Sequence, residues 1–170
     1  MLFRSAYVAG KTLSYDFPVV NAFQPNRGGF DQIVLKSVDG GTTWNAGSAG
    51  EATGAVNTLA VNPVTPSTLY AGTATGRVFQ SIDGGAHWSR SDTGMVGAPV
   101  LSLAIAASNT ATLFAGTTAG VFKSTNGGGT WFAQNSGLTN TTVNAVAVDP
   151  TNSDIVYAAT GSGTDRKSVV

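Results

Sequence analysis

Carboxylate side chains offer the clearest chemistry in this chain, because paired carboxyl groups can hydrolyse glycosidic bonds. Such a pair places its two carboxyl groups roughly 5–9.5 Å apart and raises the pKa of one of them. The nine acidic residues are Asp16, Asp31, Asp39, Glu51, Asp83, Asp92, Asp149, Asp154 and Asp165. Asp39 and Asp83 occupy equivalent positions of a repeated motif, and Asp149 and Asp154 fall in another turn. We therefore expect no catalytic residue within this chain.

Histidine, cysteine and serine give no better support for other chemistry. His87 is the only histidine and the chain has no cysteine, so a metal cluster or a thiol nucleophile lacks its usual residues. No D-x-D-x-D-G loop of the calcium-binding type occurs. The serines have no neighbouring histidine–acid pair that would activate them. We expect no metal and no cofactor, and we interpret His87 as an exposed turn residue.

The most regular spacing belongs to a motif that occurs three times. It reads KSVDGGTTW at 36–44, QSIDGGAHW at 80–88 and KSTNGGGTW at 123–131, with spacings of 44 and 43 residues. A period of this length is typical of stacked or radial repeat proteins. In each copy the Asp or Asn can accept hydrogen bonds from backbone N–H groups, and the glycine pair allows positive φ. The motif predicts a hairpin turn whose tryptophan anchors it in the core.

The frame Ser-x-Asp-x-Gly-x-Thr-Trp resembles the Asp-box, or BNR, repeat of β-propellers such as sialidases, sortilin-type receptors, xyloglucanases and photosystem II assembly factors. The first copy matches every position, the second has His87 in place of Thr, and the third has Asn126 in place of Asp. In that family the box is a structural turn, so the resemblance implies fold rather than catalysis. The residues expected to have this structural role are Ser37, Asp39, Gly41, Thr43, Trp44, Ser81, Asp83, Gly85, Trp88, Ser124, Asn126, Gly128, Thr130 and Trp131.

The N-terminal segment resembles a second type of propeller repeat. Its string DFP…NAFQP…GGFDQIVLK, which starts at Asp16, is similar to the bacterial SBBP family and includes Asp31. Pro18 and Pro25 are incompatible with a continuous helix here. The first blade is therefore expected to begin as one kind of propeller repeat and to end in an Asp-box hairpin.

The segments between the boxes predict short strands, four to a repeat. We expect strands at 56–61, 69–73, 77–81 and 87–89, at 100–105 and 113–117, and at 143–148 and 156–160. By alternation, Val56, Thr58 and Ala60 should lie on one face of the first of these strands, and Leu59 and Val61 on the other. Apolar side chains on both faces indicate a strand that is buried between two sheets.

This pattern predicts an all-β, partial β-propeller of about three and a half four-stranded blades. We divide the chain into a hybrid blade at 1–55, Asp-box blades at 56–99 and 100–142, an incomplete blade at 143–160 and a tail at 161–170 that could be an artefact of truncation. Closed propellers typically have 4–8 blades. We therefore expect an open or truncated fragment, whose first partners are further blades of a parent chain.

Charge and hydropathy argue against two classes of partner. The chain has nine basic and nine acidic residues, so no basic surface is expected for nucleic acid. Pro99 and four glycines interrupt the uncharged stretch at 93–122, so we expect no membrane span. The sequence MLFRSAYVAG at the start lacks the apolar core of a signal peptide. The expected location is extracellular or in the cell envelope, with export directed by something outside this chain.

The expected function is a non-enzymatic binding or structural module within a larger exported bacterial protein. A carbohydrate or protein ligand would be met by connecting loops such as 94–99 and 137–142. One alternative is a fragment of a carbohydrate-active enzyme, resembling xyloglucanases or sialidases, whose catalytic acids lie outside this chain. A second alternative is an assembly factor resembling those of photosystem II.

Overall fold

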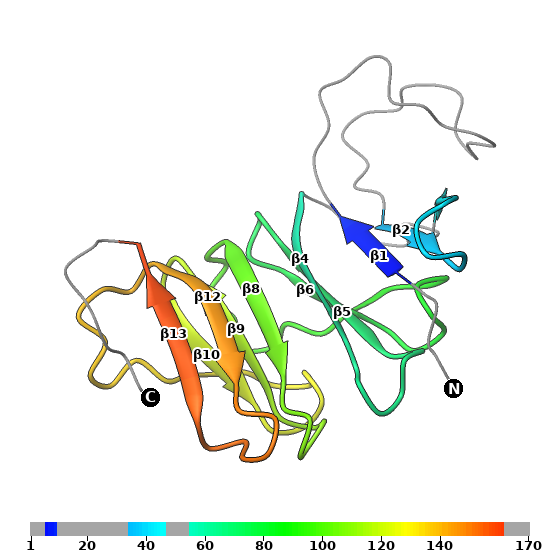
Figure 1. The fold of residues 1–170 in the computed structure, drawn as a ribbon. Coiled ribbons are helices and arrows are strands. Elements are labelled where there is room, and N and C mark those ends of the chain that lie inside the picture. Colours follow the sequence, from blue (N-terminus) through cyan, green and yellow to red (C-terminus); the bar gives the residue numbers. More distant parts are fainter. Residues whose placement is uncertain (1–5, 10–33, 47–54, 162–170) are drawn as a thin grey trace.

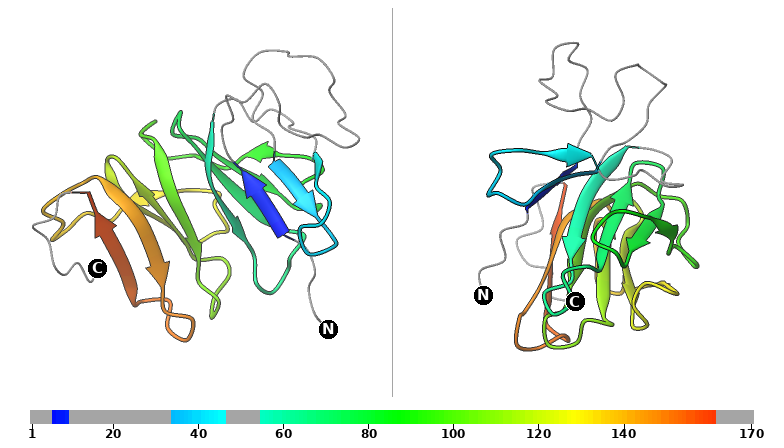
Figure 2. Two further views of the ribbon diagram at one scale, coloured as in Figure 1. Left: turned by 45° about the horizontal axis from the view of Figure 1, so that its top comes forward. Right: turned by 90° about the vertical axis from the view of Figure 1, so that its right-hand side faces the viewer.

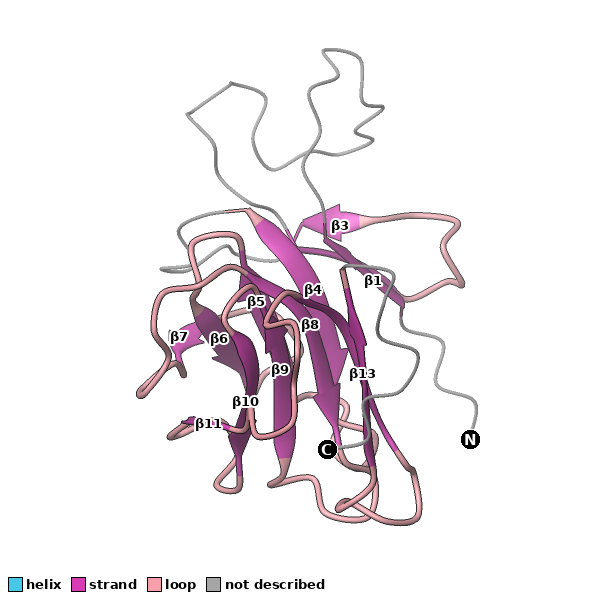
Figure 3. Ribbon diagram, turned by 90° about the vertical axis from the view of Figure 1, so that its left-hand side faces the viewer, coloured by secondary structure: helices cyan, strands magenta, loops and turns pink. Residues whose placement is uncertain are grey.

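Antiparallel strands make up all the regular structure of the computed structural model, which describes residues 6–9, 34–46 and 55–161. The all-β expectation is therefore confirmed, and Figure 3 shows only strands and loops in the described part. None of the described residues belongs to a helix that could span a membrane. Residues 10–33, which carry the SBBP-like string, and residues 162–170 of the tail lie outside the described residues.

The strands form four sheets, which we number in chain order (Figure 1). Sheet 1 contains β1 (Ala6–Ala9), β2 (Val34–Ser37) and β3 (Asn45–Ala46). Sheet 2 contains β4 (Val56–Val61), β5 (Leu69–Thr73), β6 (Val78–Ser81) and β7 (Ser89–Arg90). Sheet 3 contains β8 (Val100–Ile105), β9 (Leu113–Thr117), β10 (Gly120–Ser124) and β11 (Phe132–Ala133). Sheet 4 contains β12 (Val143–Val148) and β13 (Val156–Thr160).

The last two strands of sheet 2 differ from their expected bounds. The strand expected at 87–89 forms at Ser89–Arg90, and the one expected from residue 77 begins at Val78. Side-chain bonds hold the repeated turn as far as His87, so the ladder resumes only after Trp88. Each tryptophan of the motif thus precedes the outgoing strand instead of lying on it.

Strand register shows which positions of the sheets are equivalent. Tyr70 lies opposite Ala60 on one side and opposite Gln80 on the other. Phe114 has the corresponding partners Ala104 and Lys123 in sheet 3. In sheet 4 the equivalent residue is Tyr157, which lies opposite Ala147. In sheet 1 it is Tyr7, which lies opposite Lys36. The second strand of each four-stranded sheet therefore corresponds to β1 and β13.

A β-bulge near the start of β4 overturns part of the predicted alternation. The register shifts between Val56 and Thr58, and the same shift occurs at the start of β8 and β12. The extra residue places Val56 on the face of Leu59 and Val61 and not, as expected, on the face of Thr58 and Ala60. The expectation was wrong because a bulge adds one residue to one strand, which inverts the alternation on its N-terminal side.

Successive sheets pack face to face and fan out as an arc, which the left view of Figure 2 shows. Sheets 1 and 2 enclose the buried residues Val34, Val56, Leu69, Ala71, Phe79 and Trp88. Sheets 2 and 3 enclose Tyr70, Val78, Val100, Leu103, Leu113, Ala115, Phe122 and Trp131. Sheets 3 and 4 enclose Phe114, Val121, Val143, Val146 and Val156. Equivalent positions thus recur at each interface, and the core consists of layers between sheets.

Two glycines set how closely neighbouring sheets approach. A Cβ atom added at Gly72 of β5 would lie 2.5 Å from Cγ1 of Val100, which is the bulge valine of β8. A Cβ atom at the equivalent Gly116 would lie 2.9 Å from Cγ1 of Val143, the bulge valine of β12. Each valine therefore occupies the space that a side chain at the glycine position would need.

We expect Gly72→Ala to destabilise the protein by about 1–3 kcal/mol, because its methyl group would overpack the contact with Val100. Val100→Ala should partly restore this loss, so the double variant should cost less than the sum of the two single variants. Urea unfolding of the four proteins measures this coupling. Strictly additive costs would contradict the proposed contact.

Candidate functional site

The first repeated turn is organised by Ser37, the buried last residue of β2, and by Asp39. The Ser37 hydroxyl donates to Asp39 Oδ1 at 2.7 Å and accepts the Gly41 N–H at 2.8 Å. Asp39 in turn accepts the Thr43 N–H on Oδ1 at 2.9 Å and the Thr43 hydroxyl on Oδ2 at 2.5 Å. Gly40 and Gly41 have φ values of 73° and 92°, as the turn prediction requires. The motif residues thus bond to one another.

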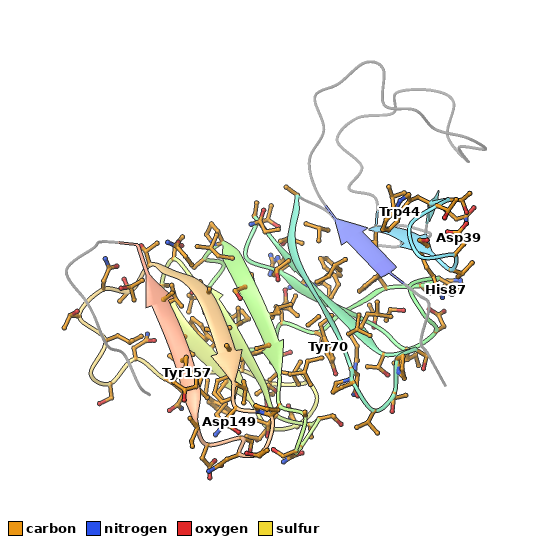
Figure 4. The ribbon with its side chains drawn as sticks, viewed as in Figure 1. Asp39, Trp44, Tyr70, His87, Asp149 and Tyr157 are labelled. Atoms are coloured by element: carbon orange, nitrogen blue, oxygen red, sulfur yellow. The ribbon has the colours of Figure 1, made fainter. Side chains whose placement is uncertain are left out.

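The second repeated turn keeps this network although histidine replaces threonine. Ser81 donates to Asp83 Oδ1 at 2.8 Å and accepts the Gly85 N–H at 2.9 Å. The backbone N–H of His87 reaches Asp83 Oδ1 at 2.9 Å, and its ring Nδ1 lies 2.6 Å from Asp83 Oδ2. The imidazole therefore takes the place of the threonine hydroxyl, while its ring is 86% exposed (Figure 4).

The third repeated turn keeps the network with an amide in place of a carboxylate. Ser124 donates to Asn126 Oδ1 at 2.9 Å and accepts the Gly128 N–H at 2.9 Å. Asn126 Oδ1 also accepts the Thr130 N–H at 2.9 Å, and Nδ2 donates to the Thr130 hydroxyl at 2.9 Å. The direction of this last bond is reversed relative to the first turn, and the turn forms without a charge.

The three tryptophans of the motif differ in burial. Trp131 is 2% exposed, and its Nε1 donates to the carbonyl of Ser91 in the preceding connection at 2.7 Å. Trp88 is 6% exposed, and its Nε1 has no hydrogen-bond partner among the described residues. Trp44 is only half-buried. The tryptophans therefore anchor sheets 2 and 3 more firmly than sheet 1.

Hydrogen bonds to ionised oxygens lower the pKa of both turn aspartates. The Thr43 hydroxyl, the Thr43 backbone N–H and the Ser37 hydroxyl, in that order, lower the pKa of Asp39 to about 2. The backbone N–H of His87, followed by its ring, lowers the pKa of Asp83 still further below its ordinary value. Both carboxylates are therefore held ionised as acceptors, which is the reverse of the raised pKa that a general acid needs.

Asp92 is a buried carboxylate that holds two arginines. It is 9% exposed, and its oxygens lie 3.4 Å from Arg77 Nη1 and 3.0 Å from Arg90 Nη2. In sheet 3 the positions equivalent to Arg77 and Asp92 carry Gly120 and Asn135. The Asn135 side chain accepts the Val121 N–H at 2.8 Å and donates to the Ala119 carbonyl at 3.0 Å.

The contact between Arg77 and Asp92 is not among the predicted features. The signal was present in the aligned repeats, because both positions change together, from Arg77 and Asp92 to Gly120 and Asn135. A Cβ atom at Gly120 would clash with the Asn135 amide, so the smaller residue accompanies the amide. Paired changes of this kind indicate that two positions are in contact.

Asp149 belongs to the turn between β12 and β13. Its Oδ1 accepts the Thr151 N–H at 2.8 Å, the Thr151 hydroxyl at 2.6 Å and the Asn152 N–H at 3.1 Å. Bonds from Thr151 chiefly lower the pKa of Asp149. Asn62 forms the equivalent turn in sheet 2, where its Oδ1 accepts the N–H groups of Val64 and Thr65. The two side chains thus have the same role.

The loops that were expected to meet a ligand gather on one edge of the array, which we call the connector face. Its residues are 55, 74–77, 94–99, 117–119, 137–142 and 161. Three equivalent backbone bonds define it, from Ala74 N to Ala55 O at 2.7 Å, from Thr118 N to Pro99 O at 3.2 Å and from Gly161 N to Thr142 O at 3.0 Å. Val96 in its middle loop is 66% exposed.

Residues 6–9, 34–46 and 55–161 contain no group of three or more His, Asp or Glu side chains that is arranged to hold a metal ion. The side-chain clusters described above are three equivalent turns, each in its own sheet, and one arginine–aspartate cluster. The acids at 16, 31, 51 and 165 lie outside the described residues.

Comparison with known proteins identifies the fold. No family model matches the chain, and no curated protein sequence matches it. A GH74 xyloglucanase from Xanthomonas campestris is similar with a TM-score of 0.61 and 18% identity, over 91% of this chain and 25% of that one. An ancestral GH74 enzyme gives 0.58 and 22%, over 74% and 19%. YCF48 bound to D1 peptide gives 0.52 and 15%, over 75% and 40%.

These similar structures are β-propellers, and identities this low establish the fold alone. The chain spans between 19% and 40% of the length of the three proteins. Together with the arc of sheets, this similarity shows that the chain is an all-β, partial β-propeller.

We expect Trp88→Ala to cost roughly 3–5 kcal/mol, because it removes a large buried side chain from the layer between sheets 1 and 2. Trp44→Ala should cost less, since Trp44 is only half-buried. His87→Thr should be nearly neutral, because Thr43 makes the equivalent backbone and hydroxyl bonds to the aspartate of the first turn. Thermal unfolding of the three variants checks this order, and an unchanged melting curve for Trp88→Ala would refute the anchoring role.

The double variant Asp39→Asn/Asp83→Asn should be less sensitive to acid than the wild type. The folded-state pKa values of both aspartates are lowered, so the stability they contribute is present above about pH 5 and is lost as the pH falls towards about 2. Asn keeps the turn, as Asn126 does, without titrating. Urea unfolding midpoints at pH 5 and pH 2 test this, and equal losses in both proteins would contradict it.

Proposed function

We propose that this chain is part of a larger, exported bacterial β-propeller that acts as a non-enzymatic binding module. The observation that carries this proposal is the use to which the described carboxylates are put. Asp39 and Asp83 bond within their own turns, Asp149 bonds within its loop, and Asp92 is held by two arginines. These acids are structural acceptors, which suits a scaffold better than a hydrolytic site.

The repeated turns are proposed to be Asp-box, or BNR, repeats, and residues 16–36 an SBBP-type repeat. The support for the Asp-box assignment is the common pattern of bonds. In all three turns the serine hydroxyl donates to the Asp or Asn side chain and accepts a glycine N–H. This holds although the Asp position carries Asn126 in the third turn and the Thr position carries His87 in the second. A pattern kept despite such changes is what a structural repeat requires.

The connector face is the proposed ligand surface, and a protein is the proposed ligand. Val96 offers an exposed apolar side chain there, and Arg77, in the turn between β5 and β6, has a side chain that is 45% exposed. One similar structure, YCF48, was solved with a D1 peptide, and another belongs to the COPII outer coat. These two similar structures support the choice of a protein ligand, and they are compatible with the second alternative above, an assembly factor.

A fragment of a carbohydrate-active enzyme is the second candidate function. The observation that favours it is the GH74 xyloglucanase similarity, which covers 91% of this chain with a TM-score of 0.61. This chain spans only 25% of that enzyme, and the described carboxylates bond within turns or to arginines, so the catalytic acids of such a protein would lie in other blades.

Peptide and glycan arrays probed with the purified chain test the leading proposal. We expect peptide binding that Val96→Asp weakens by more than about fivefold, as for a central interface residue. Ile82→Asp is the matched control, because Ile82 is 73% exposed in the second repeated turn, away from the connector face. Release of reducing sugar from xyloglucan by the full-length protein would instead establish the enzyme.

A further inference from the structure

One face of sheet 4 is apolar and uncovered among the described residues. It carries Ala145, Ala147, Tyr157 and Ala159, which we call the outward face. All four residues are exposed, and Tyr157 is 53% exposed. The opposite face of the same sheet packs on sheet 3 through Val143, Val146 and Val156 (Figure 1).

The equivalent faces of sheets 2 and 3 are covered by the next sheet. Tyr70 and Phe114, which correspond to Tyr157, are 2% and 4% exposed. Sheet 3 covers sheet 2, and sheet 4 covers sheet 3, with the same positions in contact each time. Continuity of this interface points to another sheet as the occupant of the outward face.

Two side chains of sheet 4 are of the same type as those through which sheet 2 makes polar contacts with sheet 3. In sheet 2, Asn57 Nδ2 donates to the Val100 carbonyl at 3.0 Å, and the Tyr70 hydroxyl donates to the Gly127 carbonyl of the third repeated turn at 3.0 Å. Sheet 4 has Asn144 and Tyr157 at these positions, whereas sheet 3 has Leu101 and Phe114. The outward face is therefore equipped for a sheet that has a repeated turn of its own.

Two other positions depart from the pattern. Gly72 and Gly116 leave room for a bulge valine of the next sheet, but their equivalent in sheet 4 is Ala159. Thr58 and Ser102 accept backbone N–H groups of the next sheet, from Leu103 and Val146, each at 3.2 Å. Their equivalent in sheet 4 is Ala145, whose side chain has no acceptor. A sheet identical to sheet 3 would therefore collide with the Ala159 methyl group.

We propose that the outward face of sheet 4 binds a further four-stranded sheet of the parent propeller, whose first strand carries glycine, alanine or serine where β8 and β12 carry Val100 and Val143. The smaller residue makes room for the Ala159 methyl group. This inference rests on the proposed function only in that a larger propeller supplies the sheet.

Cysteine accessibility tests the occupant, because the 170-residue chain contains no cysteine of its own. Ala147→Cys places a thiol on the outward face, and Ala104→Cys places one at the equivalent position that sheet 4 covers. In the 170-residue chain, Ala147→Cys should react rapidly with a maleimide and Ala104→Cys slowly. In the full-length parent protein, Ala147→Cys should react more than about tenfold more slowly, because a covered thiol reacts only through local opening.

Equal reactivity of Ala147→Cys in both proteins, or a parent without a further sheet, would overturn the proposal. So would a labelling rate in the 170-residue chain that falls as protein concentration rises, since a second copy would then cover the face. Ala104→Cys reports in each case whether sheets 3 and 4 are folded. A parent protein that fails to bind a ligand, or that hydrolyses xyloglucan, would contradict the proposed function. Neither result changes the expected labelling rates of the two cysteine variants, so the two proposals can fail separately.

The size requirement is tested in the parent by a matched pair of changes. The residue of the next repeat that is equivalent to Val143 is replaced by Val, with Ala159 either kept or changed to Gly. When Ala159 is kept, the introduced Val should collide with its methyl group, loosen the interface and make Ala147→Cys react faster. In the Ala159→Gly background the introduced Val should leave the labelling rate of Ala147→Cys unchanged. If the introduced Val leaves the labelling rate unchanged both with Ala159 and with Ala159→Gly, the proposed size requirement is wrong.

Discussion

The contact between a glycine of one sheet and a bulge valine of the next is the constraint on which the array depends. At Gly72 and Gly116 the backbone of one sheet is left open, and Val100 and Val143 fill the space. Each valine reaches that position because a bulge shifts it onto the buried face of its strand. Glycine, bulge and valine are therefore three parts of one contact, and loss of any of them changes the distance between sheets.

The repeated turns solve a different problem, which is to close each outer hairpin chiefly through bonds between the turn's own residues. A buried serine hydroxyl bonds both to the Asp or Asn and to a glycine N–H, so few polar groups of the turn remain unsatisfied. Buried polar groups are costly unless they are bonded. The turn tolerates His87 and Asn126 because each replacement supplies an equivalent bond within it.

Much of the fold could be predicted from the sequence, because apolar strands bounded by turn residues have a strong local signal. The strands expected at 56–61, 69–73, 100–105 and 113–117 have these bounds in the structure. The bulges could not be predicted from alternation alone, since an inserted residue leaves the composition of a strand unchanged. The contact of Arg77 with Asp92 joins residues that are distant in sequence, and only comparison of the repeats indicates it.

The placement of acidic residues gives the array an uneven response to protons. Sheet 3 and its flanking connections, from residue 93 to residue 142, contain no Asp or Glu, and Asn126 closes the third turn. Sheets 1 and 2 depend on Asp39 and Asp83, and sheet 4 on Asp149. In a repeat protein each unit is stabilised mainly by its own contacts and those of its neighbours. Acidification would therefore loosen both ends of the described array while its middle sheet kept every bond it has at neutral pH.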